Sequence, residues 1–308
     1  VFLLLRKEYV FALPIGHLLA AFFTELIFIM LNWKWFSFHY VRWERIKVLL
    51  MIGLPLLPNF LIYWVFNSCD RLMISKILGM EYTGIYAVGS KFGQISQLIY
   101  TAFAGGWQYF AFSTMRDQDQ VELTSRIFEY LGTLAVAATI VVSLGTDLLF
   151  VPLFGEAYRG AAVTVPYLFM APLIQMLFQI AGNQFIVIKK TWPSSCILFF
   201  GAVANIALNA LLIPRIGIEG AAAATLAGFA VSAIVCVAVL QKMKLFQMPV
   251  RFLIVIGLYI VYFISRRIYS VSFTVSVIEA AVILAGFIFC YRKDVGMLLK
   301  LGKDKAAE

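Results

Sequence analysis

The sequence has 308 residues, of which 62% are hydrophobic and only 13% are charged. Soluble domains contain about 45–50% apolar and about 25% charged residues, so this composition excludes a soluble globular protein. Apolar runs of about 20 residues, the length that crosses a bilayer as a helix, recur along the chain. The short alternating segments of a membrane barrel do not occur. We therefore predict an all-α polytopic membrane protein.

The formal net charge of +9 would suggest nucleic-acid binding in a soluble protein. Here most basic residues lie between the apolar runs, where the positive-inside rule explains them, so we expect no nucleic-acid partner. Four isolated cysteines and two histidines give no disulfide framework and no metal site. The sequence also lacks a G-x-x-x-x-G-K-[ST] loop for nucleotides. We expect no cofactor.

The apolar runs predict nine transmembrane helices. They cover residues 10–31, 47–69, 83–110, 127–150, 162–188, 193–213, 218–240, 250–268 and 271–291. Of the 25 Lys and Arg residues, 16 fall in one set of connecting segments and 8 in the opposite set, while Lys91 lies within a span. Cytoplasmic segments carry the excess of basic residues, so we expect the C-terminus inside and Val1 outside.

Residues 33–45, WKWFSFHYVRWER, join the first two spans and mix aromatic with basic side chains. Such segments lie at the headgroup level of a membrane. The segment is interpreted as an anchor in the inner leaflet, and a role in admitting a lipid substrate is the alternative.

A polar stripe runs along the second span and just past its end. It consists of Asn59, Tyr63, Asn67 and Asp70, spaced 4, 4 and 3 residues apart on one helical face. Ionisable groups at membrane depth usually face a bundle interior or a water-filled cavity. Arg71 comes next, and we expect an outer turn around Gly79.

The third span carries a second polar stripe. Its members are Lys91, Gln94, Thr101, Gly105 and Gln108, which fall near one helical face. We predict that Lys91 binds an anionic headgroup. The alternative is a lysine that snorkels to the interface or pairs with Asp70.

Amide side chains mark the fifth and sixth spans, as Gln175, Gln179, Asn183, Asn205 and Asn209. Their spacing suits interhelical hydrogen bonds and suits a cavity lining equally well. The seventh span has small residues at every fourth position, namely Gly220, Ala224, Gly228 and Ser232. Because small residues let helix backbones approach closely, we interpret this as a packing face.

Several short motifs resemble one transporter family. They are G-L-P-x-x-P-N at 53–59, the D-R pair Asp70 and Arg71, L-G at 78–79, G-I-Y at 84–86, K-F at 91–92, G-W-Q at 106–108 and P-R-I-G-I-E-G-A-A at 214–222. Together they resemble bacterial oligosaccharide and polysaccharide flippases, the Wzx-type O-antigen transporters of the multidrug/oligosaccharidyl-lipid/polysaccharide exporter superfamily.

The resemblance implies a two-bundle transporter fold with 12 or 14 spans. The motif that opens the second bundle follows only one span here, so we expect the C-terminal portion of a longer chain. Residues 1–46 would be the last helix of the first bundle and an interfacial amphipathic linker. Residues 47–240 would form the second six-helix bundle, 241–291 two additional C-terminal helices, and 292–308 a basic cytoplasmic tail.

The resemblance also implies a function. The protein would be a transporter in the bacterial cytoplasmic membrane, not an enzyme, and would translocate an undecaprenyl-diphosphate-linked oligosaccharide such as an O-antigen or exopolysaccharide unit by alternating access. Its partners would be this substrate, membrane lipids and a polysaccharide polymerase or chain-length machinery. The predicted substrate-binding residues are Lys91, Arg71, Asn59, Tyr63, Asn67, Asp70, Gln94 and Gln108.

Two other functions stay open at this point. An ion-coupled drug or metabolite exporter of the same superfamily would need a cavity acid, for which Glu25 or Asp70 could serve. A membrane polymerase or ligase of lipid-linked sugars would need a large outer loop, and the sequence has none between its spans.

The distribution of basic residues makes the orientation testable. Reporter fusions at Lys189 should report the cytoplasmic side and fusions at Arg215 the outer side, because the two positions border the same predicted span. Enzymatic reporters that are active on only one side of the membrane measure this directly. Reversed signals would invert the orientation of the whole chain.

Overall fold

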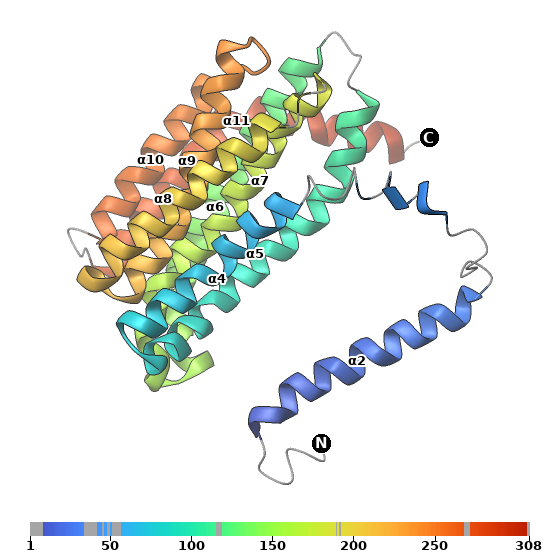
Figure 1. The fold of residues 1–308 in the computed structure, drawn as a ribbon. Helices are drawn as coiled ribbons and strands as arrows, with labels where there is room; N and C mark the ends of the chain where they lie inside the picture. The colour runs from blue at the N-terminus through green and yellow to red at the C-terminus, as the bar shows by residue number, and fades with distance from the viewer. Residues whose placement is uncertain are drawn as a thin grey trace. The chain divides into compact units, whose positions relative to one another are not determined.

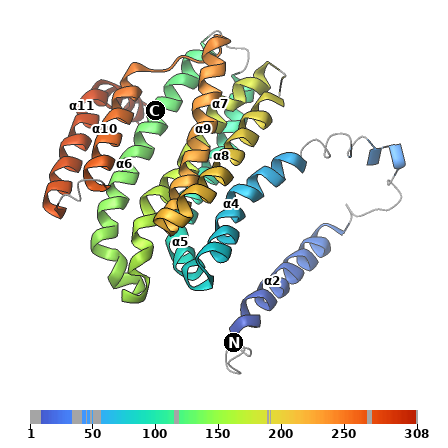
Figure 2. The ribbon, with the colours of Figure 1, turned by 60° about the vertical axis from the view of Figure 1, so that its left-hand side comes forward.

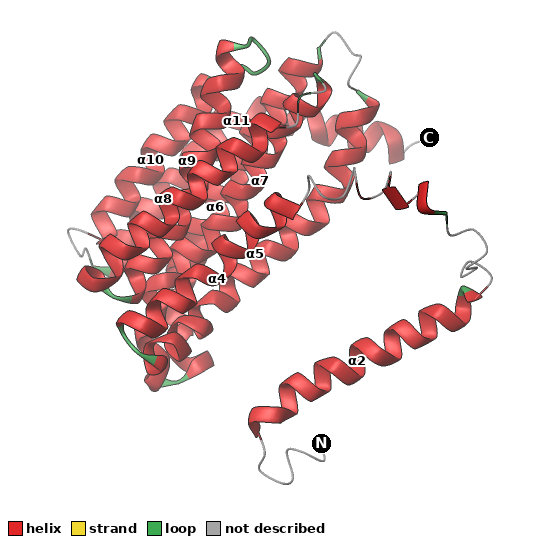
Figure 3. Ribbon diagram, in the orientation of Figure 1, coloured by secondary structure: helices red, strands yellow, loops and turns green. Residues whose placement is uncertain are grey.

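The structure is a computed structural model that describes residues 9–33, 42–44, 46–47, 50, 57–114, 119–188, 190, 192–267 and 272–306. Throughout these ranges every regular element is a helix (Figure 3). The all-α prediction is therefore confirmed. The chain divides into two units, Val1–Leu57 and Pro58–Glu308, which are described separately.

The first unit contains the helix α2 (Tyr9–Leu31), with Pro14 in its sequence. Residues Pro14–Leu31 of this helix are long and apolar enough to cross a membrane. Glu25 is exposed on α2. Most of the aromatic and basic segment 33–45 lies outside the described residues, so its predicted role at the headgroup level stays a prediction.

The second unit is a bundle of helices that run up and down in chain order (Figures 1 and 2). They are α4 (Leu57–Ile77), α5 (Met80–Ser113), α6 (Gln120–Phe154), α7 (Val165–Val187), α8 (Trp192–Ile216), α9 (Ile218–Lys242), α10 (Val250–Arg267) and α11 (Phe273–Ala306), with the 3₁₀ helix η4 (Glu156–Thr164) before α7. Together with α2, the described residues form nine α-helices. Each of the nine predicted spans overlaps one of them.

In the described part of the chain, six helical segments are long and apolar enough to span a membrane. The helices α4, α5 and α10 are not among them, and they run alongside the others in the same bundle (Figure 1). All three carry charged residues, which lower their hydropathy. The chain is therefore a multi-pass membrane protein.

Two predicted boundaries differ from the structure. The sequence predicts the second span at 47–69, whereas α4 runs from Leu57 to Ile77 and includes Asp70 and Arg71. The helix continues past these charges because Asp70 finds buried hydrogen-bond donors on neighbouring helices. Residues 48–49 and 51–56 lie outside the described residues. At the other end, α11 extends to Ala306, so the predicted last span and most of the predicted tail form one helix.

Two turns depend on glycines with positive φ. Gly79, between α4 and α5, has φ 100°, and Gly217, between α8 and α9, has φ 64°. Residues with a Cβ rarely adopt such angles, so glycine is the residue that allows these short connections. The turn predicted around Gly79 is confirmed. Both turns lie at the same end of the bundle (Figure 1).

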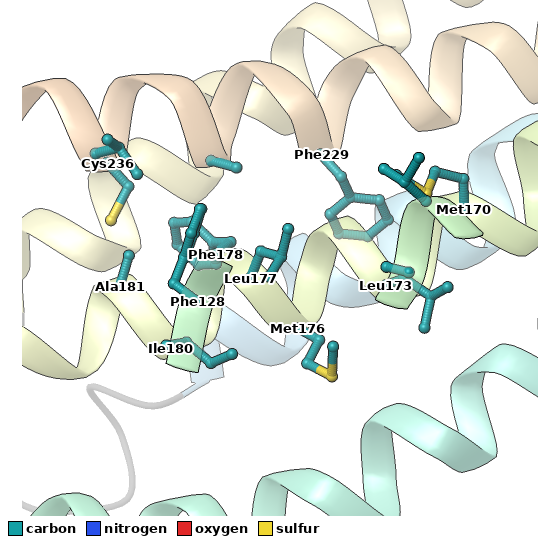
Figure 4. Packing of buried hydrophobic residues seen from close by; sticks show 14 of the residues in the cluster. Phe128, Met170, Leu173, Met176, Leu177, Phe178, Ile180, Ala181, Phe229 and Cys236 are labelled. Carbon is teal, nitrogen blue, oxygen red and sulfur yellow. The ribbon is translucent and has the colours of Figure 1, made fainter. Parts of the chain in front are cut away.

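Helix α7 forms the centre of the bundle and is buried along most of its length. Its residues Met170, Leu173, Leu177 and Phe178 belong to one apolar cluster with Phe128 from α6 and Phe229 from α9 (Figure 4). A helix that is buried on nearly all sides is typical of the core of a large bundle.

The helices α8 and α9 approach each other closely. A Cβ atom added to Gly228 would meet Asn205 Cβ at 2.8 Å and the Gly201 carbonyl oxygen at 2.9 Å. A Cβ atom added to Gly220 would meet the Leu212 carbonyl carbon at 2.6 Å. The predicted small-residue packing face of the seventh span is therefore confirmed at these two glycines.

The helices α10 and α11 lie against α6 and are attached to the bundle by polar contacts. Arg266 forms an ion pair with Asp147 of α6 and donates to Ser143 Oγ at 3.0 Å. At the other end, the Tyr291 hydroxyl of α11 donates to Glu129 Oε1 of α6 at 2.8 Å. These contacts attach the C-terminal end of α10 and the middle of α11 to α6.

The close approach of α8 and α9 gives a test of the packing. We expect Gly228→Ala to lower the free energy of unfolding by about 1–3 kcal/mol, because the new methyl group would overlap atoms of Asn205 and Phe66. Gly257→Ala on α10 is the matched control, since nothing lies within 4 Å of its added Cβ. Thermal unfolding in detergent measures both variants. Equal melting temperatures would contradict a tight α8–α9 interface.

Candidate functional site

A polar cavity of about 380 Å³ lies between α4, α5, α7 and α9. Its polar lining comes from α4 with Asn67, Ser68, Asp70 and Arg71, from α5 with Tyr86, Ser90, Gln94 and Gln97, from α7 with Gln175, and from α9 with Thr225. Phe66, Leu168 and Phe229 supply part of the apolar wall. Amides, hydroxyls, one cation and one carboxylate thus converge on a single space within a membrane protein.

Asp70 is the most buried charged residue of this cavity, with 4% of its surface exposed. Its Oδ2 accepts hydrogen bonds from the Tyr86 hydroxyl at 2.7 Å and from Thr225 Oγ1 at 2.5 Å. Its Oδ1 accepts a hydrogen bond from Asn209 Nδ2 at 2.9 Å. The donors come from α5, α9 and α8, so one carboxylate of α4 connects four helices.

The network extends behind the carboxylate through the asparagines of α8. Asn209 Nδ2 also donates to Asn205 Oδ1 at 3.3 Å, and Asn205 Nδ2 donates to Thr225 Oγ1 at 3.3 Å. Both asparagines are fully buried. They therefore act in a polar cluster between helices and do not line the cavity, which answers for these two the question that the sequence left open.

Arg71 brings positive charge to the cavity. Its side chain is exposed, and its Nη2 donates to Ser90 Oγ at 3.2 Å. A guanidinium group held by one neutral hydrogen bond keeps donors free for an anionic ligand, to which it can bind in a bidentate manner.

The amides of α7 face different surroundings. Gln175 lines the cavity and interacts with the Tyr63 side chain. One turn further on, Gln179 accepts a hydrogen bond from the Tyr100 hydroxyl. Asn183 is buried, and its Nδ2 has no hydrogen-bond partner among the described residues. Only the first of the three amides thus belongs to the cavity wall.

The structure brings together part of the predicted site. Asn67 and Asp70 of the first stripe and Gln94 of the second line the cavity, together with Arg71. Lys91 and Gln108 are exposed on α5 and do not line it, although Lys91 directly follows the lining residue Ser90. Tyr63 is half-buried and is not among the residues that line the cavity. The side chain of Asn59 lies outside the described residues.

Sequence reasoning missed several lining residues. Tyr86, Ser90 and Gln97 recur on the same face of α5 as Gln94, at a spacing that could have identified them. Thr225 directly follows Ala224, a member of the small-residue face of α9. Because that pattern of small residues predicts only helix packing, it does not identify the Thr225 hydroxyl as part of the cavity lining. Tyr86 is also the tyrosine of the G-I-Y motif at 84–86, and the motif by itself predicts no contact for this side chain.

Comparisons with known proteins bear on this geometry. A family model described as polysaccharide biosynthesis protein matches residues 2–163, which include all of α4 and α5. A probable flippase, AglR of Haloferax volcanii, is 27% identical over 188 residues. That alignment covers 58% of this chain and 38% of the relative, so the chain spans well under half of the relative's length. No solved structure matches the chain significantly.

The hydrogen bond between Tyr86 and Asp70 can be tested by removing one oxygen atom. We expect Tyr86→Phe to lower the free energy of unfolding by about 1–3 kcal/mol, since the buried carboxylate loses a donor at 2.7 Å. Tyr82→Phe, which changes an exposed tyrosine one turn earlier on α5, is the control. Chemical or thermal unfolding of the purified protein gives the comparison. Should both variants unfold alike, Asp70 would not hold α5.

Proposed function

The chain belongs to the family of polysaccharide biosynthesis proteins, and from this premise we propose that it acts as a flippase for a lipid-linked oligosaccharide. The observation that carries the proposal is the polar cavity between α4, α5, α7 and α9, which places amides and a guanidinium group inside a membrane bundle. A sugar headgroup is too polar to cross hydrocarbon unaided, because each unsatisfied polar group costs several kcal/mol there.

The chemistry of the lining suits the two parts of such a headgroup. Amides and hydroxyls such as Gln94, Gln97 and Gln175 can exchange hydrogen bonds with sugar hydroxyls. Arg71 can bind a phosphate or diphosphate in a bidentate manner, and Lys91 can attract it as a point charge. In this proposal the linked lipid is undecaprenyl diphosphate and its chain stays in the bilayer.

The proposed mechanism is alternating access in the cytoplasmic membrane, with the C-terminus inside. The helices α4 to α9 would form the second bundle of a two-bundle transporter, and α10 and α11 would be additions to it. Asn59, Tyr63 and Gln108 are also proposed to contact the substrate. A polysaccharide polymerase or chain-length machinery would receive the transported unit. No chemical bond changes in this reaction, so the protein is proposed to be a transporter and not an enzyme.

An ion-coupled exporter of drugs or metabolites is a second candidate. The buried carboxylate of Asp70 at the cavity favours it, because such exporters need an ionisable group near the solute. The two candidates differ in solute. Transport of a lipid-linked oligosaccharide that small cationic drugs do not inhibit supports the flippase, and the opposite pattern supports the exporter.

The cationic residues provide the direct test. We expect Arg71→Ala to slow flipping by about tenfold or more, since a charge-assisted hydrogen bond contributes about 1.5–3 kcal/mol. Lys91→Arg should retain most activity, whereas Lys91→Ala and Lys91→Gln should lose it. The measurement is the fraction of lipid-linked oligosaccharide that reaches the outer leaflet, at equal amounts of protein.

The control for these variants is Lys76→Ala, which removes an exposed lysine in the last turn of α4 that does not line the cavity. It should flip at the normal rate. If Arg71→Ala and Lys91→Ala also flip normally at normal abundance, neither cation binds substrate. If Lys91→Ala reduces only the amount of protein, the lysine has a structural role.

A further inference from the structure

We propose that an anionic glycerophospholipid binds to the bundle at α10, with its phosphate in a cavity lined by arginines and one of its chains in an adjoining apolar groove. Among the described residues, neither space shares a lining residue with the polar cavity beside Asp70. The proposal therefore does not depend on which solute the protein transports.

The headgroup cavity has a volume of about 350 Å³ and lies between α6, η4, α7 and α10. Three arginines line it, Arg159 of η4 and the consecutive Arg266 and Arg267 at the end of α10. Ser143 and Thr146 of α6 add hydroxyl groups to the same lining. A basic pocket between membrane helices is typical of a site for an anionic lipid headgroup.

The contacts within the protein leave part of this positive surface accessible. Arg267 pairs with the buried Glu219, and Arg159 contacts Glu156 through Nε at 3.1 Å. The side chains of Arg159 and Arg267 are nevertheless 69% and 49% exposed. Because a guanidinium group has five N–H donors, such a pair leaves donors that can bind phosphate oxygens.

The charge of the cluster suits a phosphodiester. Glu156 is 66% exposed, and an exposed ion pair contributes little, so its carboxylate can turn to water. The three arginines then face the carboxylates of Asp147 and Glu219, which leaves one net positive charge. A phosphodiester carries one negative charge and would neutralise the site, whereas the diphosphate of a prenyl-linked sugar would leave it negative.

An apolar groove of about 270 Å³ adjoins the headgroup cavity. Tyr167 of α7 and Phe263 of α10 line both spaces, and their rings pack edge to face with centroids 5.2 Å apart. Ala223, Ala227 and Ala230 line the groove along about 10 Å of α9. A lipid with its phosphate among the arginines can place a chain in this groove, which a free anion would leave empty.

Tyr259, which lines the groove, supplies a hydrogen-bond donor. Its hydroxyl is buried and has no hydrogen-bond partner among the described residues, although buried polar atoms are rarely left unpaired. Tyr259 precedes Arg266 by seven residues, about two turns or 10 Å along α10. A glycerophospholipid carries ester or ether oxygens between its phosphate and its chains, and these can accept the missing bond. A prenyl diphosphate has no oxygen beyond its diphosphate.

The test is thermal unfolding of the purified chain in detergent, with phosphatidylglycerol or phosphatidylcholine of identical chains added stepwise. A ligand that binds only the folded state raises the melting temperature once its concentration exceeds Kd. We expect a saturable rise with phosphatidylglycerol. Phosphatidylcholine, whose ammonium group cancels the charge, and inorganic phosphate, which has no chain, should each need about tenfold higher concentrations or more.

Variants locate the effect. Arg159→Gln should raise the half-saturating concentration of phosphatidylglycerol about tenfold, because it removes one charge-assisted contact. Arg215→Gln is the matched control, since Arg215 is an exposed arginine in the last turn of α8 that lines neither space.

A second pair of variants tests the groove. Ala227→Phe should fill it and weaken the response to phosphatidylglycerol to a similar extent, whereas Ala207→Phe, at an exposed alanine of α8 outside both spaces, should not. If Ala227→Phe does not fold, Arg159→Gln decides, since its side chain is exposed.

Three results would overturn the proposal. They are a melting temperature that phosphatidylglycerol raises no more than phosphatidylcholine does, a response to phosphatidylglycerol that Arg159→Gln leaves unchanged, and half-saturation by inorganic phosphate or farnesyl diphosphate at the concentrations at which phosphatidylglycerol acts. The last would assign the cavity to anions in general or to a prenyl-linked substrate. None of these measurements requires transport, so their failure would leave the proposed flippase function unaffected.

Discussion

The buried carboxylate of Asp70 is the constraint on which the arrangement of this bundle depends. A carboxylate away from water must be satisfied by the protein, and here donors from α5, α8 and α9 converge on one side chain of α4. A shift of any of these helices by one turn, about 5.4 Å, would remove its donor from reach. The network therefore fixes the register of four helices, and it does so at the wall of the polar cavity.

The convergence on Asp70 requires the close contact between α8 and α9. Gly228 and Gly201 allow the two backbones to approach until an added Cβ would overlap its neighbours. That approach brings Thr225 of α9 next to Asn205 of α8, and their hydrogen bond joins the two helices behind the carboxylate. The apolar packing of small residues and the polar cluster thus stabilise one another.

The two flanks of the bundle differ in the contacts that their helices make. On one flank, α10 and α11 lie beside α6, where the pairs Arg266–Asp147 and Tyr291–Glu129 attach them (Figure 2). On the other, α4 and α5 carry the polar side chains that line the cavity. No residue of α10 or α11 is among the described residues that line this cavity.

The sequence by itself determined the fold class, the helices of the described residues and the polar stripe of α4, because hydrophobic run length and helical spacing are local properties. It placed Asn67, Asp70 and Gln94 on helical faces that line the cavity for the same reason. Only the tertiary structure decided that Asn205 and Asn209 serve Asp70, that Thr225 is a polar partner on a packing face, and that Lys91 lies beside the cavity lining. Those outcomes depend on the rotation of each helix about its axis and on its distance from its neighbours. These are set by contacts between residues as much as 155 positions apart, which no local pattern contains.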